Sequence, residues 1–179
     1  MLNVFKGKPK YMTVRPQGEP QRKEFPDNLW TRCDCCGKMI FTKELEKTGF
    51  LCASCGHHFR ISAIKRIAML TEPGDFQAFP PLVAAYPIGF PGYAEKIKVA
   101  QEQTGLDDAA LIGKAKIQGS LCILGVIDFS FIGGSMGSVV GEQLVRGFET
   151  ALKEELPVVI FSGGGGGARM HEGIFSLMQ

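Results

Sequence analysis

The second half of the chain contains three apolar runs that predict the strands of a sheet. Residues 111–117 and 121–129 flank a Gln118-Gly119-Ser120 turn, so we expect two strands joined by a tight connection. The run at 121–129 is apolar at almost every position, as expected when both faces of a strand are covered. Residues 157–161, Pro-Val-Val-Ile-Phe, predict a further buried strand.

A glycine-rich stretch and a helix follow each of the last two predicted strands. Residues 133–137 read Gly-Gly-Ser-Met-Gly and precede a predicted helix over residues 139–155. Five consecutive glycines at residues 163–167 follow the strand at 157–161 and precede a last helical stretch. This order predicts an α/β layer with both glycine loops at the carboxyl edge of the sheet. The predicted inward positions of the first helix are Val140, Leu144, Phe148 and Leu152.

The first half of the chain divides by its content of proline and cysteine. Residues 1–29 hold four prolines among charged side chains and predict an extended arm. Residues 30–60 contain five of the six cysteines and are expected to form a small module. Residues 61–110 predict a helical connection, with an amphipathic helix over 61–70, an irregular segment over 71–92 and a helix over 93–103.

Four cysteines in the module have the spacing of a tetrahedral thiolate site for zinc, Cys33-x2-Cys36-x15-Cys52-x2-Cys55. Two residues between paired cysteines allow a tight turn that directs both sulfurs at one ion, and the residues between the pairs suffice for a hairpin. Gly37 and Gly56 follow the two pairs, where such turns favour a residue that tolerates positive φ. We therefore predict a zinc ribbon with four cysteine ligands over residues 30–60, with an apolar filling of Phe41, Phe50 and Phe59.

Disulfides and buried free thiols are the alternatives for these cysteines. The N-terminus has no apolar signal segment, and no run approaches the roughly 18 apolar residues of a membrane span. A cytoplasmic, reduced location is therefore expected, where disulfides are rare. Cys35 fits the turn less well than Cys36 as a ligand, and Cys122 fits a buried strand position. His57 and His58 are predicted to be surface or supporting residues.

Charge is unevenly distributed along the chain, although the net value is only +2. Residues 1–66 carry 13 Lys and Arg against 6 Asp and Glu, whereas residues 67–179 carry 7 against 12. A basic module of this kind could face an acidic protein, the phosphates of a cofactor or nucleic acid. Charge alone does not choose among these three partners.

The two glycine loops predict an anion-binding site, because glycine permits close approach to the main chain and the following helix offers unpaired N–H groups. A P-loop would need a Lys-Ser/Thr pair after the glycines, and residues 168–170 are Ala-Arg-Met instead. A dinucleotide fingerprint is matched formally by Gly163, Gly165 and Ala168, but a run of glycines matches almost any glycine pattern. The remaining interpretations are an oxyanion pocket for an acyl thioester and a glycine-rich turn without a ligand.

Three segments of the chain are distinctive in combination. Residues 30–33 read Trp-Thr-Arg-Cys and open the cysteine module, and residues 128–142 read Asp-Phe-Ser-Phe-Ile-Gly-Gly-Ser-Met-Gly-Ser-Val-Val-Gly-Glu. Residues 166–170, Gly-Gly-Ala-Arg-Met, are followed by Glu172. Together they resemble the β subunit of the carboxyltransferase of bacterial acetyl-CoA carboxylase. The resemblance implies a crotonase-like (ClpP/crotonase) α/β core and transfer of a carboxyl group from carboxybiotin to acetyl-CoA. The product would be malonyl-CoA, in the first committed step of fatty acid synthesis.

The same resemblance implies roles for residues of both loops. Amides of Gly166, Gly167 and Ala168 would form one side of a thioester pocket, which Gly133, Gly134 and Ser135 would line. Arg169 could meet a phosphate or carboxylate of coenzyme A, or could form an ion pair with Glu172. The implied cofactors are one zinc ion and biotin borne on a carrier protein. The implied partners are that biotin carboxyl carrier protein and a carboxyltransferase α subunit, in an α2β2 heterotetramer within a complex that binds ATP.

The sequence departs from the family pattern in two places. The second loop in the family is nearer to Ser-x-Ser-Gly-Gly-Ala-Arg-Met-Gln-Glu, whereas this chain has an extra glycine and has His171 in place of the glutamine. Residues 176–179 stop inside a predicted helix, and the family has a further Gly-Gly pair downstream. We therefore expect residues 111–179 to be the N-terminal part of a truncated domain that is inactive alone. A nucleic-acid-binding zinc module and another crotonase-like acyl-CoA enzyme are the alternatives.

Overall fold

The computed structural model describes residues 29–83, 88–163 and 165–178. The chain forms two compact units, divided between His57 and His58. The predicted N-terminal arm, residues 1–29, lies outside the described residues except for its last position. Within the described residues no helix is both long and apolar enough to cross a membrane.

The first unit is a small ribbon whose two short strands flank the first cysteine pair. Strands β1 (Trp30–Arg32) and β2 (Met39–Phe41) pair antiparallel, with Trp30 opposite Phe41. Helix α1 (Thr42–Lys47) follows β2 directly and buries Leu45 beside Phe50. The segment between the cysteine pairs is therefore a strand and a helix instead of the expected hairpin. Phe59, predicted to fill the ribbon, belongs to the second unit.

The second unit is built on a four-stranded sheet with the order β3-β4-β5-β6. Strands β4 (Ala110–Ile117) and β5 (Ser120–Ile127) form the predicted antiparallel pair around the turn at Gln118 and Gly119. Strand β6 (Val158–Ser162) pairs parallel with β5. Strand β3 (Phe76–Ala78), antiparallel to β4, lies in the segment predicted to be irregular, because three residues are too few to produce a periodic pattern.

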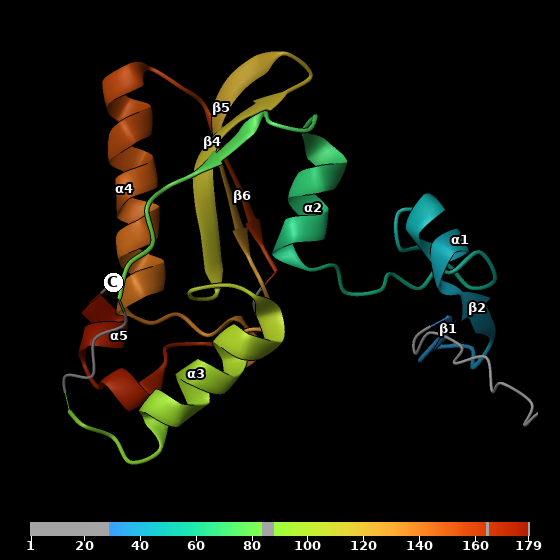
Figure 1. Cartoon of the computed structure of the whole chain (residues 1–179), viewed down its shortest axis with the longest axis horizontal. Coiled ribbons are helices and arrows are strands. Elements are labelled where there is room, and N and C mark those ends of the chain that lie inside the picture. Colours follow the sequence, from blue (N-terminus) through green and yellow to red (C-terminus); the bar gives the residue numbers. More distant parts are fainter. Residues whose placement is uncertain (1–28, 84–87, 164, 179) are drawn as a thin grey trace, which may run out of the picture. The chain divides into compact units, whose positions relative to one another are not determined.

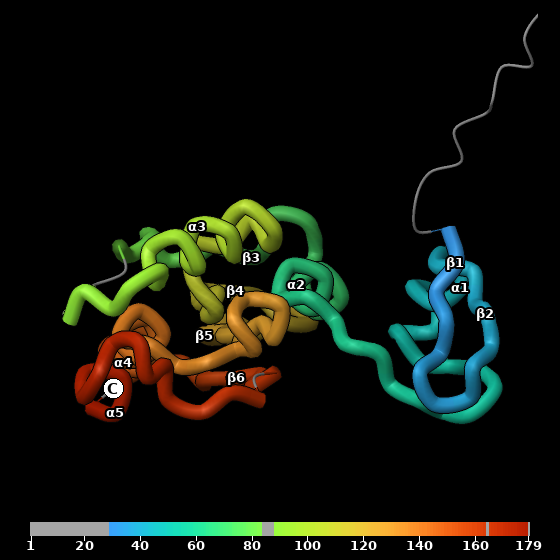
Figure 2. Tube along the Cα trace, turned by 90° about the horizontal axis from the view of Figure 1, so that it is seen from below, coloured from blue at the N-terminus to red at the C-terminus, as the bar shows by residue number. Residues whose placement is uncertain are grey.

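Helices cover both faces of this sheet, as Figures 1 and 2 show for α2 and α4. Helix α2 (Ala63–Leu70) is capped by the Ser62 hydroxyl, which accepts a hydrogen bond from the N–H of Lys65. Helix α3 (Tyr93–Thr104) ends at Gly105, as predicted. Side chains from α2, α3 and α4 share one core with β5, which explains why the sequence of β5 is apolar on both faces.

Helix α4 (Ser138–Glu154) faces the core with two of its four predicted inward residues, because Val140 is fully buried and Leu144 packs against the core. Phe148 and Leu152, predicted to point inward, are 50% and 83% exposed, whereas Gly147 and Ala151 are buried. A Cβ atom at Gly147 would lie 3.3 Å from the Ile112 side chain, so the backbone of α4 packs closely on the sheet. Small residues permit this approach, so a pattern that counts only large apolar residues is wrong for the second half of the helix, at Phe148 and Leu152.

Candidate functional site

Both glycine loops leave the same edge of the sheet, as predicted. The first loop follows β5 and contains the short helix η1 (Ile132–Gly134), and the second follows the neighbouring parallel strand β6. A further short helix, η2 (Met170–Glu172), and α5 (Phe175–Met178) complete the described chain. The carboxyl ends of adjacent parallel strands meet at one edge, so the predicted residues of both loops are brought together.

Among the described residues, three main-chain hydrogen bonds join the two loops. The N–H of Gly166 donates to the carbonyl of Gly133 at 3.1 Å, and the N–H of Met136 donates to the carbonyl of Gly167 at 3.0 Å. The N–H of Arg169 donates to the carbonyl of Met136 at 2.8 Å, which completes a parallel bridge between Met136 and Ala168. These bonds therefore hold the two loops side by side.

Two glycines are required by the close contact between the loops themselves. A Cβ atom at Gly166 would lie 2.9 Å from the Cα of Ser135, and one at Gly137 would collide with the carboxylate of Glu172. Such contacts are shorter than carbon atoms tolerate, so any larger residue would push the loops apart. The predicted reason for these glycines was access for a ligand, and at Gly166 and Gly137 the structure shows a different one.

The amides of the second loop are not equivalent. The Gly166 N–H is used within the protein, whereas those of Gly167 and Ala168 have no acceptor among the residues that the structure describes. Gly167 is exposed and Ala168 is half-buried, so a ligand can reach this pair. An unpaired donor in a partly enclosed site favours an electronegative atom of a ligand as its partner. The candidate oxyanion donors are therefore Gly167 and Ala168.

Arg169 uses all five of its N–H donors inside the protein. Nη1 and Nη2 bind the two carboxylate oxygens of Asp108 at 2.9 and 2.7 Å. Nη2 also donates to the Ser135 carbonyl at 2.8 Å, Nε to the Ser135 hydroxyl at 3.2 Å and Nη1 to the Tyr93 hydroxyl at 3.3 Å. The predicted ion pair of Arg169 with Glu172 exists, with Nη1 3.6 Å from Oε1, but Asp108 is the closer partner. A bond from this side chain to a ligand would require one of these five to be given up.

Glu172 of η2 is fully buried, and its carboxylate lies at the N-terminus of α4. Its Oε2 accepts the N–H of Ser138 at 2.6 Å, and its Oε1 accepts the hydroxyl of Tyr93 and lies 3.6 Å from Nη1 of Arg169. Burial by itself would raise the pKa of Glu172, but these hydrogen bonds hold the pKa below its ordinary value. The N–H of Ser138, at the start of the helix predicted to offer unpaired donors, therefore already binds an anion from the protein.

His171, the departure from the family pattern, packs on this network. Its ring stacks on Tyr93 with centroids 5.1 Å apart and meets Phe90 edge-on at 4.8 Å. Burial lowers the pKa of His171, which favours the neutral ring at neutral pH. Sequence reasoning missed Asp108 and Tyr93 altogether, because neither stands near a glycine loop in the chain.

A hollow of about 500 Å³ lies beside the first loop and carries positive charge. Arg60, which precedes α2, and Lys96 of α3 line it together with Phe129 and Gly133. The Arg60 guanidinium stands 3.5 Å from the centre of the Phe129 ring, a cation–π contact. A Cβ at Gly165 would lie 3.1 Å from that ring, so the second loop packs against Phe129 as well. The hollow thus adjoins both loops.

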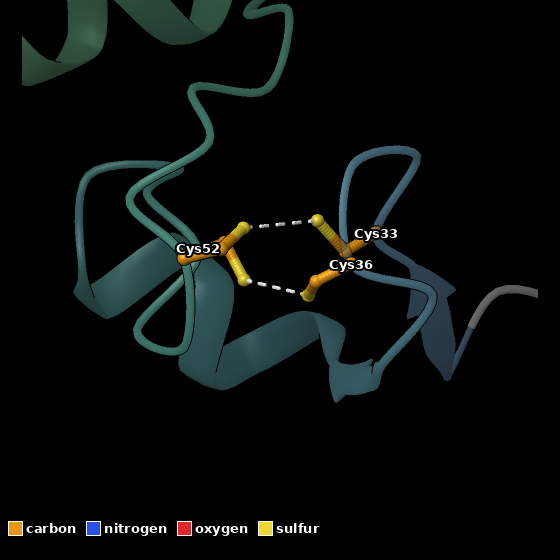
Figure 3. Close-up of side chains that lie close together, drawn as sticks. Cys33, Cys36 and Cys52 are labelled. Atoms are coloured by element: carbon orange, nitrogen blue, oxygen red, sulfur yellow. Dashed lines mark hydrogen bonds between the residues drawn. The ribbon is translucent and has the colours of Figure 1, made fainter.

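The four predicted cysteine ligands form one cluster in the first unit (Figure 3). Sulfur atoms lie 3.7 Å apart in the pair Cys33 and Cys55 and 3.8 Å apart in the pair Cys36 and Cys52. A tetrahedral ion with bonds of about 2.3 Å separates its sulfur ligands by about 3.8 Å, so the cluster fits a metal ion of that size.

The main chain around the cysteine cluster is arranged in two equivalent turns. The N–H groups of Gly37 and Gly56 donate to the carbonyls of Cys33 and Cys52 at 2.8 Å, with φ of 72° and 71°. The N–H of Ser54 lowers the pKa of Cys52, whereas burial and hydrogen bonds to the other thiols raise the pKa of Cys55, so the two thiols share a proton in the absence of an ion. Of the other two cysteines, Cys35 is exposed and outside the cluster, and Cys122 is buried in β5.

Comparisons with known proteins agree with this geometry. Residues 60–179 match the family model of the carboxyl transferase domain. The chain is 47% identical over its whole length to an acetyl-coenzyme A carboxylase carboxyl transferase subunit beta from Carboxydothermus hydrogenoformans. It is 46% identical to the corresponding subunit from Desulforamulus reducens. The chain spans 63% and 64% of the length of these two relatives.

A solved structure shows the same fold. The crystal structure of the transcarboxylase 12S hexamer with methylmalonyl-coenzyme A bound superposes with a TM-score of 0.53 and 25% identity. The superposition covers 66% of this chain and 21% of that one. The predicted crotonase-like α/β fold is therefore confirmed. With two glycine loops joined at the edge of such a sheet and a family match over residues 60–179, the chain belongs to the carboxyl transferase family.

Proposed function

We propose that this chain is the acyl-CoA-binding component of an acetyl-CoA carboxylase carboxyltransferase. The reaction moves a carboxyl group from carboxybiotin, borne on a carrier protein, to acetyl-CoA and yields malonyl-CoA. The observation that carries the proposal is the pair of reachable amides at Gly167 and Ala168, which have no acceptor in residues 29–83, 88–163 and 165–178. The names of the relatives support the same reaction.

The reaction needs donors for a developing negative charge. Removal of a proton from the methyl group of acetyl-CoA places charge on the thioester oxygen, and fixed amides stabilise that charge without reorganising. The amides of Gly167 and Ala168 would donate hydrogen bonds to this oxygen. Gly133, Gly134 and Ser135 would line the space beside it. In the net reaction the partner's biotin would give up the carboxyl group and take up the proton that the methyl group loses, so this chain needs no nucleophilic side chain.

The basic hollow gives the proposed substrate a second point of attachment. Coenzyme A carries a diphosphate and a ribose phosphate, and Arg60 and Lys96 offer two cations beside the first loop. Phe129 joins the hollow to the second loop through its contacts with Arg60 and Gly165. One extended ligand could therefore place its phosphates in the hollow and its thioester at the amides.

We further propose that the cysteine cluster binds one zinc ion, on the basis of its sulfur geometry.

The proposed partners are a carboxyltransferase α subunit, in an α2β2 assembly, and a biotin carboxyl carrier protein, in the cytoplasm. A nucleic-acid-binding role for the ribbon is the second candidate, favoured by 13 basic against 6 acidic residues in residues 1–66.

Two measurements test the proposal. Acetyl-CoA should bind the chain more tightly than S-ethyl-CoA does. S-ethyl-CoA has the same phosphates but lacks the thioester carbonyl that the two amides would bind. Equal affinities for the two ligands would contradict the role of Gly167 and Ala168.

With the α subunit and carboxylated carrier protein added, malonyl-CoA should form, and the chain alone should form none. Competing RNA or DNA should not displace acetyl-CoA; a strongly salt-dependent affinity for nucleic acid together with no thioester binding would favour the second candidate.

A further inference from the structure

The buried Arg169 network joins segments that are far apart in the sequence. Asp108 precedes β4, Tyr93 opens α3, Ser135 belongs to the first glycine loop and Glu172 lies in η2. The side chain of Arg169 is 0% exposed, and that of Asp108 is 1% exposed. Arg169 also follows Ala168 directly, and its own N–H donates to the Met136 carbonyl at 2.8 Å, so both its side chain and its main chain fix the loop immediately after the amides of Gly167 and Ala168.

We propose that Arg169 is a positioning residue which, with Asp108 and Glu172, holds the first glycine loop against the second and so aims the amides of Gly167 and Ala168. The inference rests on the proposed function for its catalytic meaning. The structural part of the proposal does not depend on activity. It states that the side chains of Arg169, Asp108 and Glu172, more than the three main-chain hydrogen bonds, set the distance between the loops.

The main-chain bonds by themselves give the loops little rigidity. Each loop is rich in glycine, and glycine loses more conformational freedom on ordering than any other residue. Arg169 counters this loss at Ser135, because it binds both the carbonyl and the hydroxyl of that residue. The other end of the guanidinium is held by two bonds to Asp108. The planar fork fixes both ends at once, which a single ammonium group does not do.

Glu172 extends the same device to the start of α4. It accepts the N–H of Ser138, the first residue of the helix, and the hydroxyl of Tyr93, which also accepts from Arg169. The network contains two carboxylates and one guanidinium, and the helix N-terminus and the tyrosine hydroxyl compensate the second negative charge. Loss of the guanidinium would leave two carboxylates buried without a cation, so the loops would have to open to admit water.

The test compares Arg169→Lys with Arg146→Lys, an arginine in an exposed ion pair with Glu142 on α4. Amide hydrogen exchange is measured residue by residue in the whole chain. In Arg169→Lys, exchange at Gly166, Met136 and residue 169 should accelerate about tenfold or more, while Leu124 and Val126 in β5 stay protected. Arg146→Lys should change neither group. In the assembled transferase, Arg169→Lys should lower kcat by on the order of 100-fold and leave KM for acetyl-CoA within about threefold.

Each result supports or overturns the inference. Unchanged exchange at the loop amides, or equal acceleration in the loops and in β5, would overturn it, because the arginine would then be dispensable or merely part of global stability. If Arg169→Lys does not fold, Ser135→Ala removes only the Nε hydrogen bond and should accelerate exchange at the same amides a fewfold. Accelerated loop exchange in a chain whose wild type never supports carboxyl transfer would refute the proposed function and leave the loop-holding role intact.

Discussion

The carboxylate of Glu172 accepts the N–H of Ser138 at 2.6 Å and thereby binds the segment after β6 to the helix that follows β5. Glu172 is completely buried, and Gly137 is the residue that leaves room for it. The helix N-terminus at this point thus holds an anion from the protein's own chain. The anion-binding capacity of the site is left to the amides of Gly167 and Ala168 and to the basic hollow.

Replacement of Glu172 by glutamine should reveal this buried charge in the pH dependence of stability. The pKa of Glu172 is lowered in the folded chain, so its stabilising effect is present above the ordinary value of about 4.3 and is lost as pH falls below it. Glu172→Gln should cost about 2 kcal/mol in urea unfolding at pH 7 and progressively less toward pH 3. Glu142→Gln, in an exposed pair, should cost little at either pH. A constant difference between wild type and Glu172→Gln would contradict the assignment.

Neighbouring glycines in the second loop should respond differently to alanine. At Gly166 the new methyl group would meet the Cα of Ser135 at 2.9 Å, whereas at Gly167 it would meet nothing within 4 Å. Gly166→Ala should therefore destabilise the chain by about 1–3 kcal/mol, and Gly167→Ala should leave the free energy of unfolding nearly unchanged. Thermal or urea unfolding of the two variants measures this contrast, and equal effects would show that the loops do not pack as described.

Arg60 and Lys96 should contribute to binding of coenzyme A through its phosphates. Either change to alanine should weaken acetyl-CoA binding about fivefold, in line with the energy of a solvent-accessible ion pair, and the loss should shrink at high salt. Lys98→Ala, on the same helix but outside the hollow, is the matched control. Acetylpantetheine lacks the nucleotide, the ribose phosphate and the diphosphate, so the same substitutions should affect its binding less. A similar loss for both ligands would place the phosphates elsewhere.

Removal of one cysteine ligand should release the metal from the ribbon. Wild-type chain should contain about one zinc ion per chain by elemental analysis, and Cys52→Ser should contain far less and lose the fold of the first unit. Cys35→Ser should keep the metal, because Cys35 lies outside the cluster. Unchanged zinc in Cys52→Ser would refute the site. A strong chelator should unfold the first unit of the wild type and leave exchange in β5 unaffected.

Much of this architecture was predictable from local patterns. The cysteine spacing predicted the cluster, because two residues between ligands are a local geometric requirement. The apolar runs predicted β4, β5 and β6, and the glycines predicted two loops at one sheet edge. The three-residue strand β3 gave too short a signal, since it pairs only because β4 is already in place.

The sequence by itself determined which segments form strands, helices, metal ligands and glycine loops, since these depend on residues close together in the chain. Tertiary structure decided the inward face of α4, where Gly147 and Ala151 replace Phe148 and Leu152 against the sheet. It also decided that Arg169 binds Asp108, 61 positions away, and that the N–H of Gly166 has an acceptor while those of Gly167 and Ala168 have none within the described part of the chain. These outcomes depend on distances between elements, and such distances are set only when the elements pack around a common core.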